Sequence, residues 1–283
     1  MGRYWASCAI ERCVPVPNAD AMSSDAVMVS TDGGIARIRL NDPDRRNAWS
    51  PALLEGLADG LERVESSGAR CLVLEAAGEA FSAGGDIEQL RTWREDDFEE
   101  RLTRADRIHR EVIAPLVRFP LPTIAKVDGA ALGGGATLAA ACDLQVASER
   151  TRIGFVFRDI GLCIDSGTSY VLPRLVGENT AKHLVYTGRV LEAAEAAELG
   201  LFTEVHPTES FERRAEALVS EVADGPTVAL RMDKRLLTGA AETPLEEALK
   251  DEALAMARVA ATEDHEEGVS ASQEGRDPEF VGR

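Results

Sequence analysis

Two glycine-rich segments have the residue types and spacing to bind a developing negative charge. They are Ala83-Gly84-Gly85-Asp86 and Leu132-Gly133-Gly134-Gly135-Ala136, and each follows a predicted strand and precedes a predicted helix. Glycine lets the backbone approach a ligand closely, and the first turn of a helix carries N–H groups without intrahelical partners. If the two turns face each other, two N–H groups can bind one oxygen atom, as in an oxyanion hole. Two tight strand-to-helix connections would have the same sequence, and the spacing alone favours neither interpretation.

The second turn could also be read as a dinucleotide-binding loop. Such a loop needs three glycines in the pattern Gly-x-Gly-x-x-Gly and an acidic residue about twenty positions further on. The run of glycines at 133–135 lacks the third glycine at that spacing. We therefore expect no nicotinamide dinucleotide to bind here.

The elements that must position these turns alternate between strands and helices, which is typical of an α/β core. A hairpin is predicted around Asp32-Gly33-Gly34, and a helix is predicted from Ser50-Pro51, where serine is the cap and proline occupies the first turn. The predicted strands lie at 27–30, 35–40, 71–74, 123–127, 143–148 and 202–205. The predicted helices lie at about 88–118, 192–199, 208–223, 226–239 and 244–262.

The composition excludes several classes of partner. The chain has 283 residues, a formal net charge of -18 and a pI of about 4.7, so phosphate backbones and anionic membrane surfaces are unfavourable partners. No apolar stretch is long enough to span a membrane. Five scattered cysteines, an odd number, indicate free thiols in a reducing compartment, and no Cys/His set has metal-ligand spacing. We expect a cytoplasmic protein without a metal site.

A family resemblance extends from residue 27 to residue 283. The segment from Ala80 to Ile87, Ala80-Phe81-Ser82-Ala83-Gly84-Gly85-Asp86-Ile87, resembles the first oxyanion-hole segment of the crotonase (enoyl-CoA hydratase/isomerase) superfamily. Pro122-Thr123-Ile124-Ala125-Lys126-Val127-Asp128-Gly129, with the glycines that follow, resembles the second. Further matches are Asn47-Ala48, Cys142-Asp143-Leu144, Leu172-Pro173-Arg174-Leu175-Val176-Gly177 and Arg276-Asp277-Pro278-Glu279-Phe280.

The resemblance implies an α/β spiral of ββα units with a C-terminal helical trimerisation region. We expect a disordered extension over 1–25, with a natural start at Met22 or Met28, a core domain over 26–205 and a helical region over 206–283. The implied assembly is a homotrimer or homohexamer. The implied ligand is an acyl-CoA thioester as substrate, without a further cofactor.

The resemblance also assigns roles to individual residues of this chain. Gly85 and Gly134 would supply the two oxyanion N–H groups. The coenzyme would meet the segment 82–86, namely Ser82, Ala83, Gly84, Gly85 and Asp86, and Arg46 and Ala48 would lie along its path. Arg46 could equally be a solvated loop charge, and Asp86 is also expected to brace its own loop through backbone N–H groups.

The carboxylates depart from the hydratase pattern. Hydratases of the superfamily carry two glutamates, and the matching positions here hold Thr137 and Phe157. Hydration needs a water molecule that is held and split by a base and an acid, so both groups would be missing. Several isomerases of the superfamily carry one catalytic carboxylate at the position of Asp165. The resemblance therefore favours double-bond isomerisation through a thioester enolate, with Asp165 as the acid/base.

Three alternatives stay open at this point. Asp165 could only cap the helix that begins near Gly167, since aspartate is a frequent helix cap. The protein could be a divergent enoyl-CoA hydratase or a hydrolase that activates water in another way. It could also be an acyl-CoA-binding subunit without activity. His109 lies in a charged amphipathic stretch and is expected at the surface or in an interface.

Overall fold

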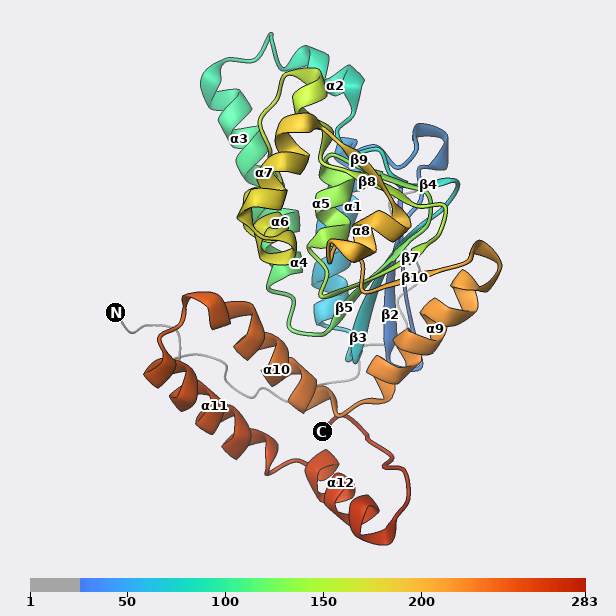
Figure 1. Ribbon diagram of the computed structural model, residues 1–283, viewed down its shortest axis with the longest axis vertical. Coiled ribbons are helices and arrows are strands. Elements are labelled where there is room, and N and C mark those ends of the chain that lie inside the picture. The colour runs from blue at the N-terminus through green and yellow to red at the C-terminus, as the bar shows by residue number, and fades with distance from the viewer. Residues whose placement is uncertain (1–25) are drawn as a thin grey trace.

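The computed structural model describes residues 26–283, so the predicted extension over 1–25 lies outside the described residues. Helices surround two sheets, with strand orders β1-β2-β3-β5-β7-β10 and β4-β6-β8-β9 (Figure 1). The strands are β1 (Val27–Asp32), β2 (Ile35–Leu40), β3 (Cys71–Ala76), β4 (Ala80–Ser82), β5 (Thr123–Val127), β6 (Ala130–Leu132), β7 (Leu144–Ser148), β8 (Arg152–Gly154), β9 (Val190–Glu192) and β10 (Glu204–His206). The α-helices are α1 (Pro51–Glu65), α2 (Ile87–Thr92), α3 (Phe98–Ile108), α4 (Ala114–Val117), α5 (Gly134–Ala140), α6 (Thr168–Val176), α7 (Glu178–Thr187), α8 (Ala193–Glu198), α9 (Thr208–Asp224), α10 (Thr227–Gly239), α11 (Leu245–Val259) and α12 (Glu263–Glu274).

The strands repeat a ββα unit. β2, β3, β5, β7 and β10 run parallel in the larger sheet. After β3, β5 and β7 the chain enters a short strand of the smaller sheet before it returns to helix, which confirms the expected α/β spiral. The smaller sheet is absent from the sequence prediction, because strands of three residues are too short to show an alternating pattern.

The first hairpin and the first helix follow their sequence signals. β1 and β2 pair antiparallel, and both turn glycines have positive φ, 55° at Gly33 and 80° at Gly34. The hydroxyl of Ser50 accepts a hydrogen bond from the N–H of Leu53 at 3.2 Å and so caps α1. The apolar side of α1 is buried in the main core through Leu53, Leu57, Leu61 and Val64.

The predicted charged helix over 88–118 is divided in the structure. α2 ends at Thr92, and α3 begins at a capping box in which the side chains of Asp97 and Glu100 each accept a hydrogen bond from the other residue's N–H. α3 then continues into α4 through a π-helical turn, η2 (His109–Ile113). A π turn contains one residue more than an α-helical turn and therefore redirects the side chains around it.

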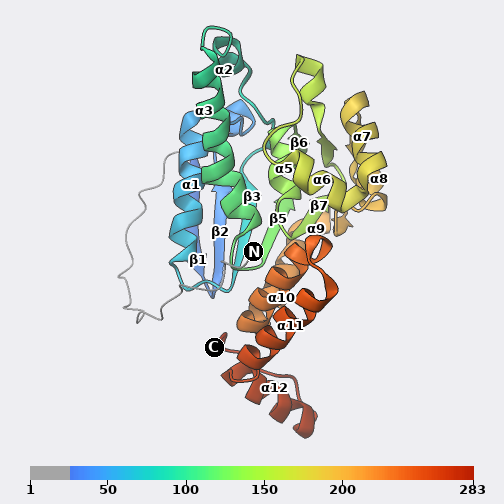
Figure 2. The same cartoon turned by 90° about the vertical axis from the view of Figure 1, so that its left-hand side faces the viewer.

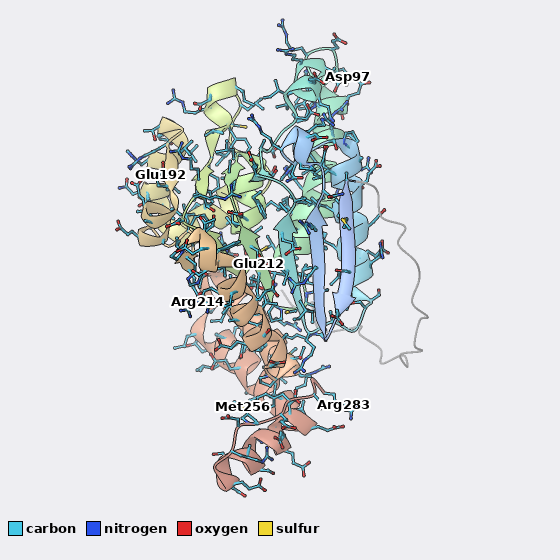
Figure 3. All side chains as sticks on the ribbon, turned by 90° about the vertical axis from the view of Figure 1, so that its right-hand side faces the viewer. Asp97, Glu192, Glu212, Arg214, Met256 and Arg283 are labelled. Atoms are coloured by element: carbon cyan, nitrogen blue, oxygen red, sulfur yellow. The ribbon has the colours of Figure 1, made fainter. Side chains whose placement is uncertain are left out.

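Helices α10, α11 and α12 form a C-terminal arm (residues 227–274) that projects from the core (Figures 1 and 2). Arg70 anchors the base of this arm by donating hydrogen bonds to Thr227 Oγ1 at 2.9 Å and to the Gly225 carbonyl at 2.7 Å. The arm exposes large apolar side chains, including Leu237, Leu245, Leu249, Leu254 and Met256, the last of which is labelled in Figure 3. Within residues 26–283, no helix combines the length and apolar character that a membrane crossing requires.

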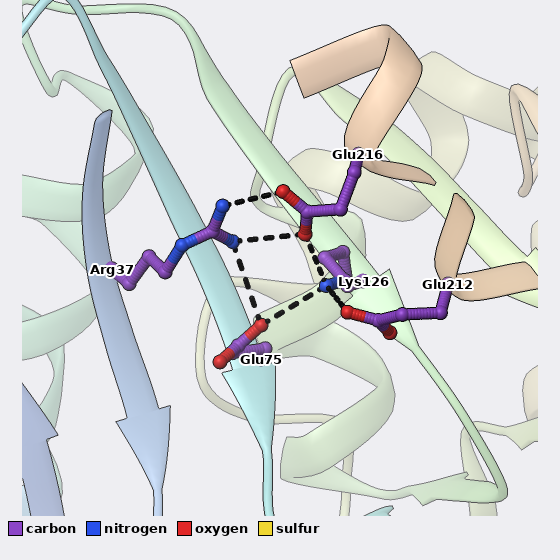
Figure 4. Close-up of polar contacts among 5 residues, drawn as sticks. All are labelled: Arg37, Glu75, Lys126, Glu212 and Glu216. Carbon is purple, nitrogen blue, oxygen red and sulfur yellow. Dashed lines mark hydrogen bonds and ion pairs between the residues drawn. The ribbon is translucent and has the colours of Figure 1, made fainter. Parts of the chain in front are cut away.

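A charge network joins α9 to the larger sheet (Figure 4). The Nζ atom of Lys126, whose side chain is 4% exposed, lies 2.8 Å from Glu212 Oε1 and 2.6 Å from Glu216 Oε1. It also lies 3.2 Å from Glu75 Oε2. Arg37 makes two hydrogen bonds to Glu216. These side chains share one sheet face with the apolar residues that α9 covers, because side chains along a strand alternate between faces.

The network shifts the pKa values of two of its members in opposite directions. Burial raises the pKa of Glu216, but the hydrogen bonds from Lys126 and Arg37 outweigh burial and lower it below the ordinary value of 4.5. Burial lowers the pKa of Lys126, but its hydrogen bonds to Glu212 and Glu216 outweigh burial and raise it above 10.5. The contribution of Glu216 to stability is therefore complete above pH 4.5 and is lost as the pH falls through its folded-state pKa. That of Lys126 is complete below pH 10.5 and is lost as the pH rises.

We expect Glu216→Gln to lower the free energy of unfolding by about 1–2 kcal/mol at pH 7, because two cations lose a partly buried anion. The difference from the parent should shrink as the pH falls below 4.5, where the parent itself loses the charge. Urea unfolding at several pH values measures both effects. Glu212→Gln is the control, and its effect should be smaller because the Glu212 side chain is 74% exposed. A loss that is the same at every pH would contradict this role.

Candidate active site

The two glycine turns pack against each other with no room for side chains between them. A Cβ atom on Gly84, which has a φ of +77°, would lie 2.4 Å from the carbonyl oxygen of Leu132 and 3.0 Å from the nitrogen of Gly134. A Cβ atom on Gly135 would lie 2.4 Å from the carbonyl oxygen of Ser82. Glycine is therefore required at both positions by the approach of one turn to the other.

The segment from Arg46 to Trp49 holds the first turn from its other side. The Ala83 N–H donates to the Arg46 carbonyl at 2.9 Å, and the Trp49 N–H donates to the Gly84 carbonyl at 2.8 Å. Arg46 and Asn47 have positive φ values of 54° and 52°, which are uncommon for residues other than glycine. The buried Asn47 side chain offsets this strain, since its amide donates to the carbonyls of residues 77 and 80 at 3.0 and 2.9 Å.

The N–H groups of the two turns divide into those with an internal partner and those without. The Gly84 N–H donates to Ser82 Oγ at 3.1 Å, and the Gly133 N–H donates to the Gly154 carbonyl at 2.8 Å. Within residues 26–283, no hydrogen bond occupies the N–H of Gly85 or of Gly134. The two amides that the family resemblance implies as oxyanion donors are thus both among the turn amides without a partner in the described residues.

Gly85 and Gly134 line the same cavity, which has a volume of about 280 Å³. Its walls are largely apolar and come from three parts of the chain: the start of α1, the helices from α2 to η2, and the segment before α6. The apolar lining residues include Leu54, Leu90, Trp93, Ile108, Val112, Phe157 and Leu162. The segments 88–118 and 155–165 therefore both contribute to this wall.

The residues predicted to meet the coenzyme have different positions. Ala83 and Asp86 line the cavity together with Gly85, whereas Arg46 and Ala48 do not, and their contact with a coenzyme stays a prediction. The side chain of Ser82 is fully buried and donates to the Asn47 carbonyl at 2.8 Å while it accepts from Gly84. The Ser82 side chain therefore braces the turn, and a contact of Ser82 with the coenzyme stays a prediction.

Asp86 has the bracing role expected from its position. One carboxylate oxygen accepts a hydrogen bond from the Glu88 N–H at 3.0 Å, which caps α2, and the other pairs with Arg45. Other carboxylates at the cavity also have arginine partners. Glu55 and Glu111 both pair with Arg107, at 3.4 and 2.7 Å.

Asp165 also lines the cavity, and its partner is a histidine instead of an arginine. Its Oδ1 atom lies 2.5 Å from His109 Nε2 and accepts a hydrogen bond from the Ser166 N–H at 2.6 Å. Within the described part of the chain, no hydrogen bond reaches its Oδ2 atom. α6 is preceded by Gly167 and has no side-chain cap, so the interpretation of Asp165 as a helix cap is wrong. His109 lies at the surface as expected, with its side chain 42% exposed, and it also contacts Asp165, which the sequence did not indicate.

The two positions that hold glutamates in hydratases provide no carboxylate to this cavity. Phe157 lines the wall, and Thr137 is fully buried in α5. Thr137 Oγ1 lies 2.6 Å from Thr168 Oγ1, and Thr168 donates to the Asp165 carbonyl at 2.6 Å. Because each hydroxyl has one proton, the chain of hydrogen bonds runs from Thr137 through Thr168 to the backbone of Asp165. Thr137 thus supports the loop that carries the remaining carboxylate.

Comparisons with known proteins show the family to which the chain belongs. Residues 30–283 match the family model described as "Enoyl-CoA hydratase/isomerase". The chain belongs to the enoyl-CoA hydratase/isomerase family. It is 40% identical over 249 residues to a Thermus thermophilus protein named "Putative enoyl-CoA hydratase", a match that covers 88% of this chain and 98% of the relative. It is 30% identical over 258 residues to the 1,2-epoxyphenylacetyl-CoA isomerase of Escherichia coli, covering 91% and 98%.

A solved structure of an enoyl-CoA hydratase from Bacillus anthracis has the same fold. Its TM-score is 0.84 at 32% sequence identity, and the match covers 91% of this chain and 100% of that one. Enzymes of this family act on acyl-CoA substrates, and the cavity is the candidate site for one. Sequence reasoning missed two of its features, the His109 contact and the indole ring of Trp49, which packs against Gly134. The position of Trp49, directly after the Asn47-Ala48 motif, was the signal that could have revealed the second.

We expect Gly84→Ala to impair acyl-CoA binding, because the new methyl group must push the two turns apart. Thioester affinity should fall roughly tenfold or more, the weight of one lost hydrogen bond. Gly68→Ala is the matched control: Gly68 has a φ of +73°, and a Cβ atom there would meet nothing within 4 Å. In both variants the alanine must adopt a left-handed backbone conformation, which should lower the free energy of unfolding by about 1–2 kcal/mol. Calorimetric titration with an acyl-CoA that shows equal affinities for the two variants would contradict the close approach of the turns.

Proposed function

We propose that the protein is an enoyl-CoA isomerase that moves a carbon–carbon double bond through a thioester enolate, with Asp165 as the acid/base. The family supports an acyl-CoA substrate, and the lining of the cavity supports the choice of isomerisation. One observation carries that choice. Within residues 26–283, one oxygen of the Asp165 carboxylate contacts the Ser166 N–H and His109 Nε2, and the other oxygen has no hydrogen bond. Asp165 lines the same cavity as Gly85 and Gly134, whose backbone amides have no partner among the described residues.

The reaction needs one base that takes and returns the same proton. With a 3-enoyl thioester bound, the carbonyl oxygen lies between the N–H groups of Gly85 and Gly134. The Asp165 carboxylate takes a proton from C2, and the electron pair moves into the conjugated system, so that the carbonyl oxygen becomes an enolate oxygen. The two N–H groups stabilise this charge. Asp165 then donates its proton to C4, the carbonyl re-forms, and the double bond lies between C2 and C3.

The apolar wall assists this chemistry. It offers water few hydrogen-bonding partners, so that the amide dipoles act in a medium of low polarity. A hydratase would instead need a second group to hold and split water. The matching glutamate positions provide Thr137 and Phe157, which cannot do so. Hydration, hydrolysis and binding without turnover are therefore the alternatives that an activity assay must separate.

We expect Asp165→Asn to lower the rate of isomerisation of a 3-enoyl-CoA by two to four powers of ten, the usual weight of a general acid–base residue. Acyl-CoA affinity should change little, because asparagine has nearly the same size and polarity. The control is Asp159→Asn, which removes a neighbouring cavity carboxylate that lies 4.0 Å from Arg158. Isomerisation and hydration are each followed with a 2-enoyl and a 3-enoyl thioester.

The alternatives give different results in the same assays. Hydration of the 2-enoyl thioester that is faster than isomerisation would assign a hydratase. Thioester hydrolysis as the main reaction would assign a hydrolase, and binding without any turnover would assign a binding subunit. Full isomerase rate in Asp165→Asn together with loss in Asp159→Asn would move the base to Asp159.

We also propose that the protein assembles as a homotrimer or homohexamer through the C-terminal arm. The support is the set of large apolar side chains that the arm exposes, among them Leu245 (67% exposed) and Leu249 (54% exposed). Light scattering should report a trimer or a hexamer, and Leu249→Glu should weaken the assembly. Tyr186→Glu, on α7 and outside the arm, is the control for an exposed side chain. A monomer at micromolar concentration would contradict the proposal.

A further inference from the structure

His109 lies between two cavities of the protein. Its Nε2 atom contacts Asp165, which lines the cavity of about 280 Å³ that also contains Gly85 and Gly134, here called the acyl cavity. The residue itself lines a second cavity of about 750 Å³ between α4, α6 and α10. His109 is therefore part of the wall that separates Asp165 from this second cavity. His109 does not itself line the acyl cavity.

The hydrogen bonds of the Asp165 carboxylate assign different tasks to its two oxygens. Oδ1 accepts from the Ser166 N–H at 2.6 Å, and the same atom lies 2.5 Å from His109 Nε2. An ionised carboxylate can only accept, so His109 must donate with its proton on Nε2. Two donors on one oxygen fix the plane of the carboxylate. Oδ2 is then the oxygen that can exchange a proton with a bound substrate.

The local backbone is built so that His109 meets Asp165. His109 is the first residue of the π turn η2, and Val112 and Ile113 in the same turn are buried in the core. A Cβ atom on Gly167 would lie 2.8 Å from Ile113, so the turn packs tightly against the segment that carries Asp165. π turns interrupt α-helices at functional sites more often than elsewhere, because they redirect a side chain without ending the helix.

We infer that His109 is the positioning residue of Asp165: its Nε2–H holds Oδ1 and thereby directs Oδ2 toward the reacting carbons. This inference rests on the isomerase function proposed above. It predicts that the donor on His109 acts on the chemical step and not on thioester binding, since the ring lies behind the carboxylate and outside the lining of the acyl cavity.

Two substitutions at this position separate a donor from a space-filling side chain. His109→Leu keeps bulk but removes the donor, and kcat for a 3-enoyl-CoA should fall about 10- to 100-fold, as for a misplaced catalytic group, with KM nearly unchanged. His109→Gln keeps an N–H donor at similar reach and should restore most of the rate that leucine loses. His183→Leu is the control. It makes the same substitution at an exposed position on α7 and should leave the rate unchanged.

A double-substitution cycle tests whether His109 acts through Asp165. In the Asp165→Asn background, His109→Leu should cause little further loss, because the group that it positions is already absent. Urea unfolding of each variant shows whether the fold has been weakened. Equal rates in the glutamine and leucine variants would overturn the inference. So would a further loss in the Asp165→Asn background as large as in the parent.

A measurement that needs no turnover keeps this inference separate from the isomerase assignment. The chain has four histidines, so the imidazole ¹⁵N signals of His109 can be identified by comparison with His109→Gln. In the parent protein, Nε2 of His109 should carry a hydrogen-bonded proton, and Asp165→Ala should abolish that bond. Absence of the bond in the parent would overturn the inference. If the bond is present but the parent isomerises no thioester, the isomerase assignment fails, and with it the role of His109 in catalysis.

Discussion

The close contact between two glycine turns is the constraint on which the active site depends. A Cβ atom at Gly84 would meet the backbone of the second turn, and a Cβ atom at Gly135 would meet that of the first. This contact is possible because β4 and β6 pair in parallel immediately before the two turns. The pairing fixes the position of one turn relative to the other along the strand direction. The segment from Arg46 to Trp49 then locks the first turn from outside. The available amides of Gly85 and Gly134 are a consequence of this packing.

The proposed mechanism separates the part of the site that would stabilise charge from the part that would move protons. Charge stabilisation would come from backbone amides, which only the fold can place. Proton transfer depends on side chains around the cavity, which can change while the backbone stays the same. In this chain the Thr137 side chain is buried in the core, and it supports the Asp165 loop through Thr168. Phe157 has become part of the apolar wall. Among the described residues, Asp165 is the cavity carboxylate without an arginine partner. The reaction therefore depends on side chains around the cavity and not on the fold alone.

The sequence predicts those parts of the structure that depend on local patterns. The hairpin at Gly33-Gly34, the cap at Ser50 and the strand at 123–127 are examples, because turn glycines, caps and apolar runs are read from neighbouring residues. The contact between His109 and Asp165 could not be predicted in this way. It joins residues 56 positions apart and depends on a π turn, for which the sequence carries no signal. The pairing of the buried Lys126 charge could not be predicted either, because its three carboxylate partners come from β3 and α9, which lie far from it in the sequence.

The central claim is that one thioester oxygen is held by the amides of Gly85 and Gly134 while Asp165 faces the carbons beside it. A crystal structure with a bound, non-reacting acyl-CoA thioester tests this claim most directly. We expect the carbonyl oxygen to lie about 2.7–3.1 Å from both amide nitrogens. We also expect Oδ2 of Asp165, and not Oδ1, to be the carboxylate oxygen nearer to the C2 carbon of the acyl group. A thioester oxygen that contacts neither amide would contradict the account.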